Sequence, residues 1–238
     1  MPEYLQRFHK QLKEKFSGSL VKVETVKAIE PNAKEYLNKL AKAGLVDRVR
    51  WGWYWVPAEV KNVWDFFRKD RNFKIISAQT AASLWNYDFI HRDVYVLKVT
   101  DGSYGKALEK FAEGMGWKVR TEYIDKPSDV KYEKVGGLFI ESMEETIIEC
   151  MQDWAFTDAF ATLYSNRDRI KLKRLSEENY WKRISGSDVR VRQVLEYGCH
   201  LINKLTGKMM FDVKETKLED DYVKMEVEEA VEKVVSLA

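Results

Sequence analysis

Residues 32–57 read NAKEYLNKLAKAGLVDRVRWGWYWVP, and this stretch decides the fold that the sequence predicts for the N-terminal part of the chain. Apolar side chains recur on one face of a helix over residues 33–43, and lysines and polar side chains occupy the other face. Asn32 is placed to cap this helix, Glu35 follows at the spacing of a capping box, and Gly44 suits a left-handed helix end. The sequence therefore predicts an amphipathic helix with a defined start and stop.

A β-hairpin is predicted after this helix, because β-rich runs over residues 45–50 and 53–56 flank the turn Trp51-Gly52. Upstream, the apolar spacing predicts a helix over residues 5–16 and a shorter one over residues 24–29. Three helices followed by a hairpin is the element order of a winged helix-turn-helix.

The rest of the chain mixes predicted strands and helices. Strands are expected over residues 73–76, 94–99, 117–124 and 208–213. Helices are expected over residues 77–85 and 104–112, from Glu141 onward, over 191–205 and over 222–237. The predicted fold class is α+β: an N-terminal winged helix-turn-helix, then a mixed α/β domain with a helical C-terminal part. The predicted domains are 1–58 (DNA-binding), 59–72 (a connecting helix) and 73–238 (α+β, with an acidic amphipathic C-terminal segment).

Charge is unevenly placed along the 238 residues, although the net charge is only +2. Residues 1–72 carry 15 lysines and arginines against 9 acidic residues, which favours a polyanionic partner for this part. No apolar run approaches the roughly 20 residues of a membrane-spanning helix, and the N-terminus does not resemble a signal peptide. Two cysteines are too few for a disulfide framework. These features predict a cytoplasmic protein with no membrane partner.

The predicted helix over residues 33–43 is the candidate recognition helix for the major groove of double-stranded DNA, with the hairpin as a wing on the backbone. Lysines and arginines would meet phosphates and Asn38 would read a base edge. The alternative is a winged helix that docks a protein and never touches DNA. The predicted DNA-binding residues are Asn32, Lys34, Asn38, Lys39, Lys42, Arg48, Arg50 and Trp51.

The aromatic run in the hairpin has two interpretations. Bases stack on aromatic side chains in proteins that bind single strands. Strand alternation places Trp53 and Trp55 on one face, with Tyr54 and Val56 on the other, and one of these faces must cover the helices. The second interpretation is that most of these rings belong to the core or to a domain interface.

Candidate metal and catalytic groups are few. Glu141, Glu144, Glu145 and Glu149 gather on one predicted helix side, which suits a metal site or, more simply, a solvated or partner-facing acidic surface. The histidines His9, His91 and His200 form no Glu-x-x-His pattern, and Cys199-His200 does not make a zinc site. Cys150 is expected to be a buried apolar side chain. No nucleophile, phosphate-binding or dinucleotide motif occurs, so neither a catalytic residue, a metal nor a cofactor is predicted.

The C-terminal segment carries an apolar stripe of valines at helical spacing, with acidic residues around it. An isolated helix of this length is marginal in water, so we expect the stripe to pack on the second domain or on a second protomer. The alternative is a disordered tail. The valines are Val223, Val227, Val231 and Val234.

Residues 37–54, LNKLAKAGLVDRVRWGWY, resemble the N-terminal winged helix of the AbiEi-type antitoxins, in which a recognition helix, a Gly-Leu turn and an Arg-x-Gly-x-Tyr wing follow in this order. Residues 76–82, ISAQTAA, are similar to the Ser-Ala-Leu helix that opens the second domain of that family. Residues 144–150, EETIIEC, resemble its Glu-Arg-Thr-Leu-x-Asp segment, with Glu145 in place of Arg and Glu149 in place of Asp. The resemblance spans about residues 5–205.

The resemblance implies a two-domain transcriptional regulator and antitoxin of a phage-defence toxin–antitoxin system. Such a protein represses its own operon by binding inverted repeats, which a homodimer would match, and it neutralises a nucleotidyltransferase toxin. Two other classes stay open: a nucleic-acid-processing enzyme that uses the winged helix to deliver its substrate, and a protein-interaction module.

Overall fold

The computed structural model describes residues 1–87, 93–175 and 180–237, and their fold mixes helices with two β-sheets. The chain forms two compact units. The first contains residues 1–75, 93–129 and 134–139, and the second contains the described residues of 76–92, 130–133 and 140–238. The domain ranges 1–58, 59–72 and 73–238 stay predictions. The two units divide the chain at other places, because residues 93–129 belong to the same unit as the N-terminal part.

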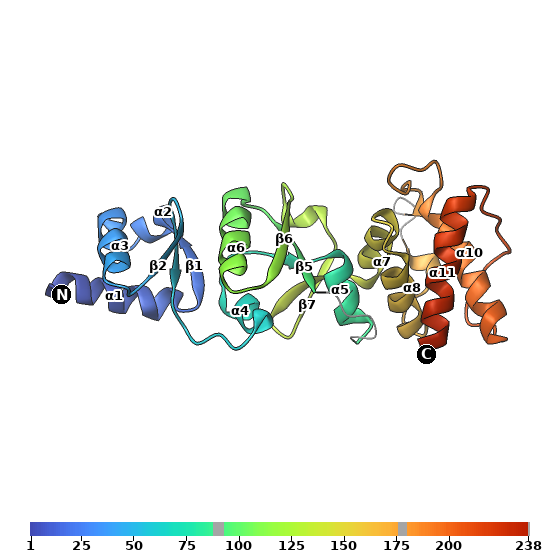
Figure 1. Cartoon of the computed structure of the whole chain (residues 1–238), viewed down its shortest axis with the longest axis horizontal. Helices are drawn as coiled ribbons and strands as arrows, with labels where there is room; N and C mark the ends of the chain where they lie inside the picture. The colour runs from blue at the N-terminus through green and yellow to red at the C-terminus, as the bar shows by residue number, and fades with distance from the viewer. Residues whose placement is uncertain (88–92, 176–179, 238) are drawn as a thin grey trace. The chain divides into compact units, whose positions relative to one another are not determined.

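The N-terminal part of the first unit consists of three helices and a three-stranded sheet (Figure 1). The strand order is β1-β3-β2, and both pairings are antiparallel, so β3 is central. The three predicted helices and the hairpin are confirmed, but β1 was not predicted, because a four-residue run is too short to show alternation. In chain order the elements are α1 (Glu3–Phe16), β1 (Ser19–Lys22), α2 (Val23–Lys27), α3 (Ala33–Lys42), β2 (Asp47–Arg50) and β3 (Trp53–Val56).

The predicted capping box at the start of α3 is wrong. Asn32 occupies the cap position, but its side chain makes no capping hydrogen bond, and its ψ of 18° is not the extended cap geometry. Glu35 instead forms an ion pair with Lys39, at 2.6 Å between Oε1 and Nζ. The predicted left-handed end is confirmed, since Gly44 has φ of +68°.

Strand β3 buries both of its faces. Tyr54 and Val56 pack into an apolar cluster with Leu5, Phe8, Leu37 and Leu40 of α1 and α3. On the opposite face, the Trp53 ring lies 5.7 Å from that of Tyr104, and the Trp55 ring lies 4.6 Å from that of Phe111, measured between centroids. Only 3% of Trp53 and 6% of Trp55 is exposed, so these rings are core and are not available to stack on bases.

The remaining elements of the first unit include α4 (Val63–Lys69), β5 (Val94–Val99), α6 (Gly102–Gly114) and β6 (Lys118–Tyr123). Strands β5 and β6 pair in parallel, with α6 as the crossover between them. The larger sheet has the order β6-β5-β4-β8-β7, with β4 (Ile75–Ile76), β7 (Tyr132–Val135) and β8 (Leu138–Glu141). The β7–β8 hairpin was not predicted, although Gly136 and Gly137, both at positive φ, form its turn.

One buried carboxylate joins several elements of the first unit. Asp70 Oδ1 accepts hydrogen bonds from the Leu20 backbone N–H at 2.9 Å and from Asn72 Nδ2 at 2.8 Å. Its Oδ2 accepts from Lys74 Nζ at 2.9 Å and from the Tyr104 hydroxyl at 2.5 Å. The side chains of Asp70, Lys74 and Tyr104 are all buried. We call these residues the Asp70 cluster, and it ties β1 to α6.

The second unit is mainly helical (Figure 1). The valine stripe of α11 is fully buried, and α11 packs on α8 and α10, which confirms the expected packing on its own chain. None of the helices in the described ranges is long and apolar enough to cross a membrane. The helices are α5 (Ala78–Trp85), α7 (Met143–Gln152), α8 (Phe156–Ser165), a 3-10 turn η2 (Leu172–Arg174), α10 (Val191–Thr206) and α11 (Asp221–Leu237).

The strand predicted over residues 208–213 is wrong. The Asn203 side chain bonds this segment instead of a neighbouring strand. Its Nδ2 donates to the Phe211 carbonyl at 2.7 Å, and its Oδ1 accepts from the backbone N–H groups of Met210 and Phe211 at 2.8 and 3.1 Å. One amide therefore satisfies the backbone groups that a sheet partner would have paired.

The ring of Phe160 in α8 packs directly against Gly198 in α10. A Cβ atom added there would lie 2.1 Å from Cζ of Phe160, a fully buried ring. We expect Gly198→Ala to lower the free energy of unfolding by about 1–3 kcal/mol, because neither backbone nor ring has room to move. Chemical denaturation followed by circular dichroism measures the change.

The control is Gly114→Ala in α6, where an added Cβ meets nothing within 4 Å. This variant should leave stability unchanged or raise it by less than about 1 kcal/mol, because alanine is the better helix former. Equal effects of the two substitutions would contradict the close packing at Gly198.

We expect Asp70→Ala to destabilise the protein by about 3–5 kcal/mol, because it leaves the Lys74 ammonium buried without its carboxylate. Glu113→Ala is the control, since Glu113 forms an exposed ion pair with Lys110 and its loss should leave stability nearly unchanged. A similar small loss in both variants would show that the Asp70 cluster does not hold the unit together.

Candidate nucleic-acid interface

Helix α3 turns a polar stripe away from the apolar cluster. Ala33, Leu37 and Leu40 are fully buried, so the positions between them face outward. This stripe is defined by Lys34, Glu35, Asn38, Lys39 and Lys42, of which all but the half-buried Asn38 are exposed. The expected polar face of the candidate recognition helix is therefore present.

Lys39 is engaged within the protein. Its Nζ lies 2.6 Å from Glu35 Oε1 and 3.1 Å from the hydroxyl of Tyr4, and it sits over the rings of Tyr4 and Tyr36 at 5.6 and 5.9 Å. The hydrogen bond to Glu35, followed by that to Tyr4, raises the pKa of Lys39 above its usual value. The ammonium is charged at neutral pH, but Glu35 balances its charge, so Lys39 attracts phosphate less than a free lysine would.

Asn38 is held by a residue of the sheet. The Tyr54 hydroxyl donates a hydrogen bond to Asn38 Oδ1 at 2.7 Å, and Tyr54 is itself buried in the centre of β3. Asn38 also lines a shallow surface hollow at the start of α3, together with Pro31, Asn32, Lys34 and Glu35. A ligand at the surface can therefore reach the Asn38 amide, while the buried Tyr54 fixes the position of its Oδ1 atom.

The β2–β3 turn carries the predicted wing residues. Gly52 has φ of +78°, a left-handed value that favours glycine at the second central position of a turn, and 78% of Trp51 beside it is exposed. Arg48 is exposed and lies opposite Tyr54 in the strand pairing, whereas Arg50 is half-buried and lies opposite Trp53. Trp51 therefore lies at the tip of the hairpin, Arg48 pairs with the residue that packs toward α3, and Arg50 pairs with the residue that packs toward α6.

The structure groups the eight predicted residues as follows. Asn32, Lys34 and Asn38 surround the hollow, Lys39 and Lys42 continue along α3, and Arg48, Arg50 and Trp51 lie on β2 and its turn. Sequence reasoning missed Tyr4 and Tyr54, which hold Lys39 and Asn38 from 35 and 16 residues away. No local spacing signals such contacts.

An acidic surface was predicted on one side of this helix. The prediction is wrong for Glu141, and the other three glutamates are only partly exposed. Glu141 is fully buried at the end of β8, and its Oε2 accepts from the Ala78 backbone N–H at 2.8 Å. Ala78 has φ of +47°, an unusual value for a residue with a side chain, and Glu141 fixes this strained start of α5. Glu144, Glu145 and Glu149 are half-buried.

The cysteines are buried thiols, as expected for Cys150. Burial, followed by the nearby charge of Asp158, raises the pKa of Cys150, and burial also raises that of Cys199, so neither is a ready nucleophile. Within residues 1–87, 93–175 and 180–237, no group of three or more His, Cys, Asp or Glu side chains is placed to hold a metal ion. His91 lies outside the described residues.

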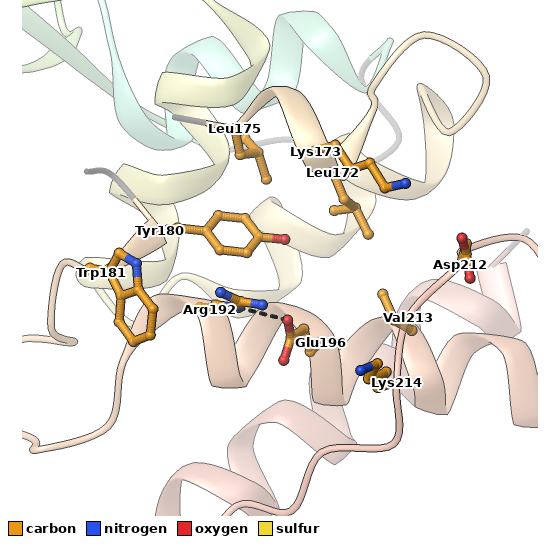
Figure 2. Close-up of a pocket in the computed structure, with 10 residues that line it drawn as sticks. All are labelled: Leu172, Lys173, Leu175, Tyr180, Trp181, Arg192, Glu196, Asp212, Val213 and Lys214. Atoms are coloured by element: carbon orange, nitrogen blue, oxygen red, sulfur yellow. Dashed lines mark hydrogen bonds and ion pairs between the residues drawn. The ribbon is translucent and has the colours of Figure 1, made fainter. Parts of the chain in front are cut away.

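A second candidate site is a hollow of roughly 530 Å³ in the second unit (Figure 2). Figure 2 shows the Tyr180 ring above the Arg192 side chain, which lies 5.5 Å from the Tyr180 ring centroid and 5.4 Å from that of Trp181. Cations on aromatic faces stabilise this wall. The hollow is lined by Leu172, Lys173, Leu175, Tyr180, Trp181, Arg192, Glu196, Asp212, Val213 and Lys214.

The acids of this hollow come from separate elements, which would suit an enzyme, but Glu196 is fully engaged. Its Oε1 accepts from Arg192 Nε at 2.8 Å, and its Oε2 accepts from Thr216 Oγ1 at 3.0 Å. Burial raises the pKa of Tyr180 to about 12, so its phenol stays protonated near neutral pH. Glu196 is therefore held by two partners, and the Tyr180 hydroxyl remains a hydrogen-bond donor.

The ion pair on α3 leads to a test of the interface. Glu35→Gln removes the charge that balances Lys39, so we expect binding to duplex DNA at about 50 mM salt to tighten roughly two- to fivefold. Glu113→Gln is the matched control, because it removes the acid of another exposed ion pair with the same change in net charge. Equal tightening by both variants would place the DNA elsewhere, and fluorescence anisotropy measures it.

No protein-family profile matches the chain, and no curated protein sequence matches it.

Proposed function

We propose that residues 1–58 form a winged helix-turn-helix that binds double-stranded DNA, and that the chain is a non-enzymatic transcriptional regulator. The observation that carries the proposal is the order α1-β1-α2-α3-β2-β3 around an antiparallel β1-β3-β2 sheet, with the polar stripe of α3 facing away from the core. In this arrangement α3 enters the major groove and the β2–β3 turn lies on the backbone.

Charge supports a polyanionic ligand for this face. Lys34, Lys42 and Arg48 are exposed, and Arg50 lies beside the exposed Trp51 at the turn. Cations on a recognition helix and its wing neutralise phosphates and position the protein, and they carry no base preference of their own. Asn38 and Asn32 are the uncharged amides of this face, and an amide is suited to a base edge.

The antitoxin role is proposed on the resemblance to the AbiEi-type antitoxins. In this proposal a homodimer binds inverted repeats in the operator of its own operon, and the partner is a nucleotidyltransferase toxin. The hollow of Figure 2 is the part of the second unit that we propose for contact with such a partner. Co-expression with a neighbouring nucleotidyltransferase tests it, since growth should recover only with the antitoxin present.

The DNA-binding proposal predicts a steep salt dependence. The logarithm of the affinity falls with the logarithm of salt concentration with a slope of about −0.9 for each phosphate neutralised, so several contacts lower the affinity roughly 10³-fold between about 50 and 200 mM. Anisotropy titrations of the full chain on duplex DNA measure the slope. Failure to bind any duplex at low salt would overturn the proposal.

Two cations on different elements test which face is used. Lys42→Ala on α3 and Arg50→Ala on β2 should weaken binding to all sequences and flatten the salt slope by about one each. Lys110→Ala is the control, because it removes a cation of the same unit on α6. If Lys110→Ala weakens binding as much as the other two, α3 is not the binding face.

A further inference from the structure

Asn38 occupies the middle of one edge of α3, one helical turn from Lys34 and one from Lys42. Both lysines are exposed and carry flexible side chains, whereas Asn38 is half-buried and short. The three side chains lie on one helical edge, which faces the DNA in the proposed function. A fixed, uncharged group between two mobile cations is suited to a base edge, because the cations reach phosphates at variable positions.

Tyr54 fixes the orientation of the Asn38 amide. Its ring is held in the apolar cluster on the central strand, and only 2% of the residue is exposed, so its hydroxyl has a fixed position. That hydroxyl donates to Asn38 Oδ1 at 2.7 Å. Burial raises the pKa of Tyr54, with Arg48 opposing it weakly, so the phenol remains a donor near neutral pH.

The hydrogen bond determines which atom of the amide faces outward. The carbonyl oxygen of Asn38 turns toward β3, and within the described part of the chain its Nδ2 has no hydrogen-bond partner. A primary amide carries two N–H donors on that nitrogen. Asn38 therefore presents N–H donors to the outside. A bidentate contact with adenine would also require its oxygen to face outward, as the acceptor for the adenine N6–H₂ group.

We propose that Tyr54 is a positioning residue that presents the Asn38 amide as a hydrogen-bond donor to the N7 atom of a purine in the major groove. This inference rests on the proposed DNA-binding function and specifies the ligand atom of that site. N7 is an acceptor that adenine and guanine both expose in the major groove, whereas a phosphate would give no base preference.

The experiment uses the full chain and a duplex selected from a random library at about 50 mM salt. Each purine of the selected site is replaced in turn by its 7-deaza analogue, which lacks the N7 acceptor. We expect one replacement to weaken binding of the unmodified protein about tenfold, within the range of a base-specific contact. In Asn38→Ala and Tyr54→Phe the same replacement should change affinity less than about twofold.

Tyr36→Phe is the matched control. It removes a hydroxyl from a second tyrosine of the same module, and the Tyr36 ring packs against Tyr4 and Phe8. This variant should keep the full tenfold effect of the 7-deaza purine. Thermal melting of all variants shows whether they are folded, and the double variant Asn38→Ala/Tyr54→Phe should lose no more discrimination than either single variant.

Three outcomes separate the inference from the function on which it rests. If no duplex binds at low salt, the proposed function fails and this inference fails with it. If the protein selects a sequence but Tyr54→Phe retains the full 7-deaza effect, the positioning role of Tyr54 is overturned. If no purine shows a 7-deaza effect, the contact of Asn38 with N7 is overturned as well, and in both cases the proposed DNA binding stands.

Discussion

The carboxylate of Asp70 is the constraint on which the first unit depends. It is buried with Lys74 and Tyr104, and each of its oxygens accepts two hydrogen bonds, so its charge is compensated without water. At β1, which would otherwise be an open sheet edge, the Leu20 N–H donates to Asp70 and the Leu20 carbonyl accepts from Asn72. The Ser19 hydroxyl adds a bond to the Lys69 carbonyl and one from the Arg71 N–H. The small sheet is thereby held from its edge as well as from its faces.

The helices could be predicted from sequence because their signal is local. Apolar residues three and four apart define α1, α3, α10 and α11, and the Gly52 turn defines the hairpin. Elements decided by distant partners were missed. Strand β1 exists because Leu20 pairs with Trp55, and residues 208–213 are not a strand because Asn203 takes their backbone hydrogen bonds. Glu141 is buried because the left-handed Ala78 needs an acceptor for its N–H.

The candidate interface divides in the same way between local and distant causes. The spacing of the apolar residues in α3 is enough to predict which positions face outward, namely Lys34, Asn38 and Lys42. The packing of α1 and β3 on α3 decides the contacts of the polar side chains. Lys39 forms an ion pair with Glu35 and a hydrogen bond with Tyr4, and Asn38 accepts a hydrogen bond from Tyr54. Periodicity therefore identifies the residues at the surface, and packing determines which of them are free to bind.

This difference between surface residues sets the balance between affinity and discrimination in the proposed regulator. Attraction to phosphate is the same for every sequence, so each added cation strengthens correct and incorrect sites together. Glu35 reduces that shared attraction by balancing Lys39, whereas Asn38 is uncharged and adds little to it. A fixed donor contributes only where the base supplies an acceptor, and it leaves a buried polar mismatch where the base does not. The rigid position that Tyr54 gives to Asn38 is therefore the feature of this face that favours one sequence over another.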